Sequence, residues 1–189
     1  GFRKIELKNA QILVNGQPVL FKGVNRHEMD PDNGYYLSPQ RMIQDIKIMK
    51  AFNINAVRTS HYPNAPYFPA LCSEYGFYMI AEADLESHGV GTLYTNDGHD
   101  CMGYIAQDDA WAESILDRQK RNVIRDKNQS AVIFWSLGNE SGYGGNFEDA
   151  GRWVKAYDPT RLLHYEASIY NSAGYHNDVS MLDVMSRMY

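Results

Sequence analysis

An amide and a carboxylate, Asn139 and Glu140, directly follow an apolar run in this sequence. The run, Val132-Ile-Phe-Trp-Ser-Leu-Gly138, lacks polar alternation, which is typical of a parallel strand covered on both faces. In closed α/β barrels the chemistry gathers at the carboxyl ends of such strands. We therefore predict that Glu140 is a catalytic residue. A lone Glu after a core strand is more often a plain loop residue, so this prediction depends on the rest of the chain.

Polar residues also follow the three preceding strand-like runs. The clusters are Asn25, Arg26 and His27, then Arg58 and His61, then Glu86 and His88. A barrel brings every strand end onto one rim, whereas an open doubly wound sheet concentrates polar residues at one switch point. No Gly-rich phosphate loop follows the first run. The pattern favours the barrel.

The elements that must position these side chains alternate between strands and helices, which predicts an α/β fold with a parallel sheet. We expect a lead-in hairpin in residues 1–18 that turns at Asn15-Gly16, and a partial barrel in residues 19–189. The barrel strands are expected at 19–26, 54–60, 77–82, 131–137, 161–166 and 182–188. The helices are expected from Ser38-Pro39, near 66–75, at about 109–127 and at about 146–157.

Two of these helices carry apolar residues at helical spacing, which predicts buried faces. The first stripe is Met42, Ile43, Ile46, Met49 and Phe52, and the second is Trp111, Ile115, Leu116, Val123 and Ile124. The segment Gly89–Asp108 shows no periodicity, so we predict a long loop that forms a wall on the rim.

Composition excludes several classes of function. The chain has 189 residues, 44% of them hydrophobic, and can bury a core as one domain or part of one. A net charge of −5 without Lys/Arg runs argues against nucleic acid or an anionic membrane as partner. No apolar stretch approaches the roughly 20 residues of a membrane span, and residues 1–10 lack the apolar segment expected of a secretory signal. Cys72 and Cys101 imply no disulfide framework, so a cytoplasmic location is expected.

Four segments together resemble the catalytic domain of β-galactosidases of glycoside hydrolase family 2. They are Phe21-Lys-Gly-Val-Asn-Arg-His-Glu28, Asn55-Ala-Val-Arg-Thr-Ser-His-Tyr-Pro-Asn64, Glu82-Ala-Asp-Leu-Glu-Ser-His-Gly89 and Trp135-Ser-Leu-Gly-Asn-Glu-Ser-Gly142. The resemblance covers nearly the whole chain and implies a (β/α)8 TIM barrel, of which about six βα units are present here. It also implies hydrolysis of terminal β-D-galactosides such as lactose.

Retaining glycosidases use two carboxyl groups about 5–5.5 Å apart, a general acid/base and a nucleophile. Glu140 resembles the general acid/base, and Asn139 resembles the asparagine that binds the sugar 2-hydroxyl. Arg58 ends the second strand, where its guanidinium could hold the nucleophilic carboxylate ionised. His27 and His61 resemble histidines that contact galactose hydroxyls, and Tyr189 resembles an active-site tyrosine that contacts the nucleophile.

A metal site is the other implication of the resemblance. Glu86 and His88 are two residues apart, so their side chains leave an extended segment from the same face, and Glu140 would complete the set. Ligand type alone does not select the metal, since imidazole suits zinc and carboxylates with retained waters suit Mg²⁺. The resemblance implies Mg²⁺, with Na⁺ possible in a longer chain and its ligands not located here.

The departures from the family pattern concern the end of the chain. No strand-seven Cys-Glu-Tyr segment appears before Tyr189, so the nucleophilic glutamate is expected beyond it, and the chain alone is expected to be inactive. Glu166 follows the wrong strand for a nucleophile and is predicted to be structural or supporting. The longer chain is expected to be a homo-oligomer. Alternatives are a non-catalytic sugar-binding or assembly fragment, a β-glucuronidase-like relative, and a metal-dependent hydrolase that uses Glu86, His88 and Glu140.

Overall fold

The structure is a computed structural model that describes residues 2–93, 103–169 and 176–186. A three-stranded antiparallel sheet comes first, formed by β1 (Ile5–Lys8), β2 (Gln11–Val14) and β3 (Gln17–Pro18). Its two-residue turns, Asn9-Ala10 and Asn15-Gly16, have positive φ at both positions, the geometry that suits tight hairpins. The predicted turn at Asn15-Gly16 is confirmed, and a second turn precedes it.

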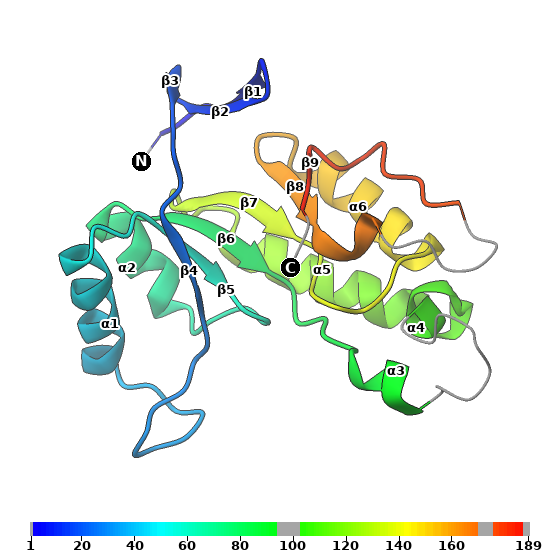
Figure 1. Cartoon of the computed structure of the whole chain (residues 1–189), viewed down its shortest axis with the longest axis horizontal. Coiled ribbons are helices and arrows are strands. Elements are labelled where there is room, and N and C mark those ends of the chain that lie inside the picture. The colour runs from blue at the N-terminus through cyan, green and yellow to red at the C-terminus, as the bar shows by residue number, and fades with distance from the viewer. Residues whose placement is uncertain (1, 94–102, 170–175, 187–189) are drawn as a thin grey trace.

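Six parallel strands form the main sheet in the order β4-β5-β6-β7-β8-β9 (Figure 1). Their bounds are Gly23–Arg26, Ala56–Thr59, Tyr78–Glu82, Val132–Ser136, Leu162–Tyr165 and Val184–Met185. The spatial order follows the chain order without the reversal that a doubly wound sheet requires. The α/β prediction and all six predicted strands are confirmed. The first strand begins later than expected, because residues 19–22 lie outside the ladder.

The helices are α1 (Pro39–Ala51), α2 (Tyr67–Tyr75), α3 (Gly89–Leu93), α4 (Gly103–Gln107), α5 (Ala112–Asp126) and α6 (Gly145–Tyr157), with 3₁₀ turns at Asp109–Trp111 and Glu166–Ile169. Ser38 caps α1 by accepting from the Arg41 N–H at 3.2 Å. Among the described residues no helix is long and apolar enough to cross a membrane.

The two faces of the main sheet belong to different cores. On one face, buried side chains of the long helices pack against Val57, Met79, Trp135 and Leu163. On the other face, a smaller cluster joins Phe134 and Leu162 to Ile5, Ile12 and Phe21 of the lead-in segment. Sequential right-handed crossovers put all helices on one face, so the opposite face is the one that a barrel would enclose.

Three residues that the sequence predicts on buried helix faces are exposed, and the predicted rim loop is wrong in part. Phe52 is exposed because α1 ends at Ala51, and its side chain leaves the helix past the buried stripe. Trp111 and Ile124 are also exposed. The buried face of α5 instead includes polar side chains that donate to carbonyls of the strand region, Gln119 to Leu137 at 2.6 Å and Asn122 to Ala81 at 3.2 Å.

The segment predicted as an aperiodic loop, Gly89–Asp108, contains the short helices α3 and α4, and its residues 94–102 lie outside the described part of the chain. Asn146 of α6 donates to the Ile105 carbonyl at 3.0 Å and to the Asp108 carbonyl at 2.8 Å, which holds the α4 segment against α6. Cys101 lies outside the described residues, and Cys72 is a buried free thiol. Burial raises the Cys72 pKa to about 12, so this thiol is not reactive.

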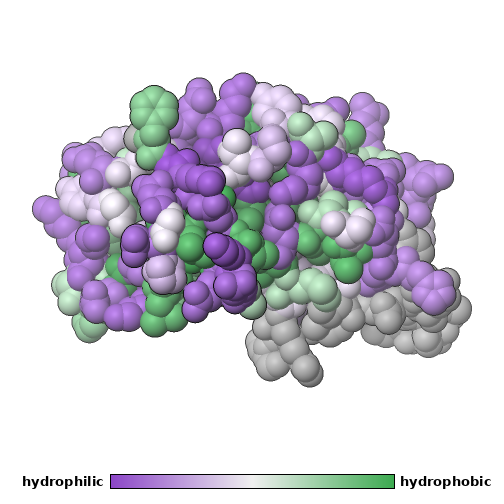
Figure 2. All heavy atoms as spheres, turned by 90° about the horizontal axis from the view of Figure 1, so that it is seen from above, coloured by the Kyte–Doolittle hydropathy of each residue, from purple (hydrophilic) through white to green (hydrophobic). Residues whose placement is uncertain are grey.

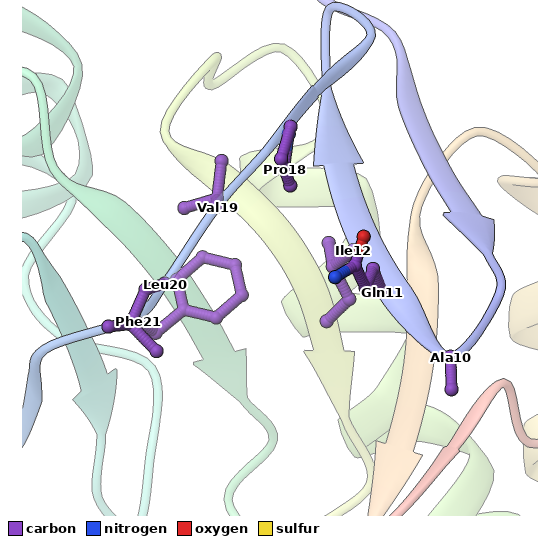
Figure 3. Close-up of a pocket in the computed structure, with 7 residues that line it drawn as sticks. All are labelled: Ala10, Gln11, Ile12, Pro18, Val19, Leu20 and Phe21. Atoms are coloured by element: carbon purple, nitrogen blue, oxygen red, sulfur yellow. The ribbon is translucent and has the colours of Figure 1, made fainter.

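A groove of about 620 Å³ lies between the lead-in sheet and the start of the barrel segment (Figure 3). Its lining is mainly apolar and comes from residues 10–12 and 18–21, without a titratable side chain. It is at the amino-terminal end of β4, opposite the strand ends that carry the polar clusters. Figure 2 shows mainly hydrophilic side chains on the face seen from above, with hydrophobic ones between them. We assign no chemistry to the groove.

Candidate active site

The buried centre of the polar rim is Glu82, the last residue of β6, which is 0% exposed. Its Oε2 accepts from Arg58 Nε and from Ser136 Oγ, each at 2.6 Å. Its Oε1 lies 2.8 Å from His61 Nδ1. A buried carboxylate is costly unless it is paired and hydrogen-bonded, and these partners provide both. Glu82 is the first residue of one of the four rim segments, but the sequence pattern alone predicts no role for it.

Arg58 links this centre to the amide that precedes Glu140. Its Nε contacts Glu82, and its Nη2 donates to Asn139 Oδ1 at 2.9 Å. This bond fixes which end of the Asn139 amide is the oxygen, so Nδ2 is turned toward the rim. There Nδ2 donates to Glu86 Oε2 and lies 3.5 Å from Glu140 Oε2. The carboxylate paired with Arg58 among the described residues is therefore Glu82.

Backbone pairing brings the segment after β6 against the segment after β7. Glu86 and Asn139 form a parallel bridge, and the Asn139 N–H donates to the Leu85 carbonyl at 2.8 Å. The preceding Gly138 has φ +147°, and a Cβ there would lie 2.6 Å from that carbonyl oxygen. A side chain at this position would force the two segments apart. The glycine before Asn139 and Glu140 is thus required by their placement.

Glu140 lies beside Glu86 and His88, as the sequence predicted. Its Oε2 is 2.9 Å from His88 Nδ1, and one potential ligand atom from each of the three residues lies within 4.8 Å of the others. Glu86 and His88 are exposed, and the Glu140 side chain is 23% exposed. Two carboxylates and one imidazole, open to solvent, are a donor set that fits a hydrated divalent cation.

The two predicted sugar-contacting histidines are neighbours. The His27 and His61 rings pack edge to face with centroids 5.4 Å apart. Tyr62 adjoins them, since its hydroxyl lies 3.4 Å from His27 Nδ1 and accepts from the Glu28 N–H at 3.0 Å. Tyr62 was not singled out from the sequence. Tyr189 lies outside the described residues, so the structure places the other predicted site residues but not this one.

Two buried titratable groups, one within β8 and one directly after it, complete the site. His164 of β8 lies opposite Ser136, and burial together with the Arg58 charge lowers its pKa to about 4, so its imidazole is neutral at neutral pH. Glu166 is 1% exposed and accepts from the Glu140 N–H at 2.6 Å. Burial raises the pKa of Glu166. His164 gave no sequence signal, because it lies within an ordinary strand pattern.

The sequence profile of the family described as "Glycosyl hydrolases family 2, TIM barrel domain" matches residues 5–189. The chain belongs to this family. The fold is accordingly a partial TIM barrel, and the resemblance noted in the four rim segments is confirmed at the level of the family.

Two proteins similar in sequence to this chain are β-galactosidases. A β-galactosidase of Actinobacillus pleuropneumoniae is 48% identical over 100% of this chain and 21% of its own length. A β-galactosidase of Staphylococcus xylosus is 39% identical over 100% of this chain and 19% of its length. This chain thus spans about a fifth of these relatives.

Solved structures of two β-glucuronidases agree on the fold. A β-glucuronidase of Ruminococcus gnavus superposes with a TM-score of 0.80 at 23% identity, over 98% of this chain and 32% of that one. A β-D-glucuronidase of Dictyoglomus thermophilum gives a TM-score of 0.74 at 25% identity, over 98% and 32% of the two chains. Sequence therefore relates this chain to β-galactosidases, while structural similarity extends to β-glucuronidases.

Proposed function

We propose that this chain carries the acid/base side of the active site of a retaining β-galactosidase, and that a strand outside residues 1–189 supplies the nucleophilic glutamate. The observation that carries the proposal is the placement of Glu140. It follows the end of β7, with its side chain 23% exposed at the rim, beside an amide that Arg58 orients. The similarity to β-galactosidases at 39–48% identity favours galactosides over glucuronides.

In this mechanism Glu140 first donates a proton to the leaving-group oxygen and later removes a proton from the attacking water. Asn139 Nδ2 has two hydrogens. One is used by Glu86, and the other points at Glu140 across only a long contact of 3.5 Å. That second hydrogen is available for the sugar 2-hydroxyl, where a bond strengthens in the transition state.

His61 has a defined role in this mechanism because of Glu82. The carboxylate lies against Nδ1, so the tautomer with the proton on Nδ1 is favoured and Nε2 is an acceptor. A sugar hydroxyl would therefore donate to His61 Nε2. His27 packs against the same ring and would contact a neighbouring hydroxyl.

We propose that Glu86, His88 and Glu140 hold Mg²⁺, since the donor set and its openness fit this ion. When bound, the cation would supply positive charge beside the Glu140 carboxylate. The chain's own contribution is to align the set, because Asn139 holds Glu86 and the bridge between residues 86 and 139 fixes the spacing.

Removal of divalent cations is expected to lower galactoside hydrolysis by the longer chain by at least about 10–100-fold, the loss that is typical when only the residues supporting metal ligands are changed. Added Mg²⁺ should restore the rate. His88→Ala should raise the Mg²⁺ concentration needed for half-maximal activity, whereas His176→Ala, an exposed histidine outside the cluster, should not. Steady-state rates across a Mg²⁺ titration provide the measurement. Unchanged Mg²⁺ dependence in His88→Ala would contradict the site.

The proposed function is tested by comparing aryl β-galactoside and aryl β-glucuronide hydrolysis by the longer chain and by residues 1–189 alone. We expect the longer chain to prefer the galactoside and residues 1–189 to show no more than trace activity, because the nucleophile is missing. Substantial turnover by residues 1–189 would contradict this account. A preference for the glucuronide would favour the β-glucuronidase-like alternative, and sugar binding by the longer chain without turnover would favour a sugar-binding module.

A further inference from the structure

The backbone of Glu140 has an uncommon conformation. Its φ is +33°, in the left-handed region that residues other than glycine rarely adopt. Such a conformation is unfavourable and persists only where the surroundings hold it. The flanking residues are held on the β6 side, by the Asn139 N–H on the Leu85 carbonyl and by the Ser87 N–H on Ser141 Oγ at 2.8 Å.

Glu140 itself is held from the opposite side by Glu166. The Glu140 N–H donates to Glu166 Oε1 at 2.6 Å. Glu166 directly follows β8, which pairs with β7, and the Leu137 N–H bonds to the His164 carbonyl at 3.0 Å. The acceptor is therefore attached to a strand next to the one that carries Glu140, and its position is well fixed.

A carboxyl group at position 166 is unfavourable for the stability of the fold. Glu166 is 1% exposed, and its Oε2 has no hydrogen-bond partner among the described residues. An unsatisfied buried polar atom destabilises the fold. The carboxyl group has one evident use, as acceptor for the Glu140 N–H.

We propose that Glu166 is a positioning residue for Glu140: its Oε1 holds the left-handed backbone that aims the Glu140 carboxylate at the leaving-group oxygen. This inference rests on the proposed function, in which Glu140 is the proton donor. Glu166 does not touch substrate. Its loss would misplace the proton donor without removing it, and a displacement of about 1 Å can cost on the order of 10²-fold in rate.

The test uses three Glu166 variants of the longer chain with two substrates, lactose and an activated aryl β-galactoside. Glu166→Met removes the acceptor at similar length. Glu166→Asp keeps a carboxyl group but withdraws it from the Glu140 N–H, and serves if the Met variant fails to fold. Glu166→Gln keeps an acceptor oxygen in place. Glu140→Gln is assayed in parallel as the reference for a lost proton donor.

We expect the Met and Asp variants to lose about 10–100-fold in kcat on lactose, with a much smaller loss on the activated substrate and little change in KM. Glu166→Gln should recover most of the lost rate. Equal losses on both substrates would overturn the inference, because a merely structural role does not depend on the leaving group. A Gln variant as impaired as the Met variant would also overturn it.

Failure of the proposed function gives a different result. In that case Glu140→Gln itself would show no dependence on the leaving group, and the inference about Glu166 would fall with it. If only the Glu166 variants lack this dependence, the role of Glu140 stands and the positioning role of Glu166 is wrong.

Discussion

Glu140→Gln in the longer chain is expected to lower the rate on lactose by about 10²–10⁴-fold, the usual contribution of general acid-base catalysis. The amide preserves the shape of the side chain but cannot exchange a proton. Activated aryl galactosides should lose less in the first step, because their leaving groups need no proton. Steady-state kinetics on both substrates provide the measurement.

Asp109→Asn is a suitable control for Glu140→Gln, since it removes a carboxylate from the 3₁₀ turn before α5, outside the cluster. Its rates should be close to those of the parent protein on both substrates. Equal losses for Glu140→Gln on lactose and on the activated substrate would contradict the acid/base role. The Gln variant should also respond less to Mg²⁺, because one member of the proposed ligand set is changed.

Glu82→Leu is expected to destabilise the fold by about 3–5 kcal/mol, because it leaves the Arg58 charge buried without its partner. The Arg58 side chain is 10% exposed and Glu82 is 0% exposed. In the longer chain, where a complete barrel domain has about 250 residues, the thermal unfolding midpoint of that domain should fall by roughly 10 °C. His61 and Ser136 lose an acceptor as well, so the loss is not confined to one pair.

The double variant Glu82→Leu/Arg58→Met should recover a large part of that stability, since replacing both members of a buried pair is often close to neutral. A matched surface control is Asp117→Asn, which removes the exposed ion pair with Arg121 on α5. Exposed ion pairs contribute about 0–1 kcal/mol to stability, so the thermal unfolding midpoint of Asp117→Asn should hardly change. If the thermal unfolding midpoint of Glu82→Leu equalled that of Asp117→Asn, the claim that the buried Glu82–Arg58 pair stabilises the rim would be contradicted.

Much of the rim could be predicted from the sequence because of how parallel strands are arranged. Glu140, Glu86 and His88 were each recognisable as polar residues just past an apolar run, and sequential strands bring those ends together. The spacing of two between Glu86 and His88 predicted a shared face, and the structure places their ligand atoms in one cluster with Glu140.

The buried supports of the rim could not be predicted in the same way. Glu82 is the last residue of a strand, so in the sequence it looks like another polar residue of the rim. Its side chain is instead buried on the enclosed face beneath the rim. Only the three-dimensional pairing with Arg58 shows this. Glu166 was predicted to be structural or supporting, but the bond to the Glu140 N–H depends on a backbone conformation that no sequence pattern reports.

Errors in the helices have a related cause. The apolar pattern placed Trp111 and Ile124 inside, whereas Asn122 and Gln119 occupy the buried face because strand-region carbonyls accept their amide hydrogens. A polar side chain with such a partner is as suited to burial as an apolar one. Periodicity alone does not distinguish the two.

The most direct test of the account is the configuration of the product when azide rescues Glu140→Gln on an activated aryl β-galactoside. Azide should attack the glycosyl-enzyme in place of water, because it needs no general base. We predict a β-galactosyl azide, with retained configuration by NMR. An α-galactosyl azide would show that the nucleophile had been removed, and the roles proposed for Glu140 and for the glutamate outside this chain would be reversed.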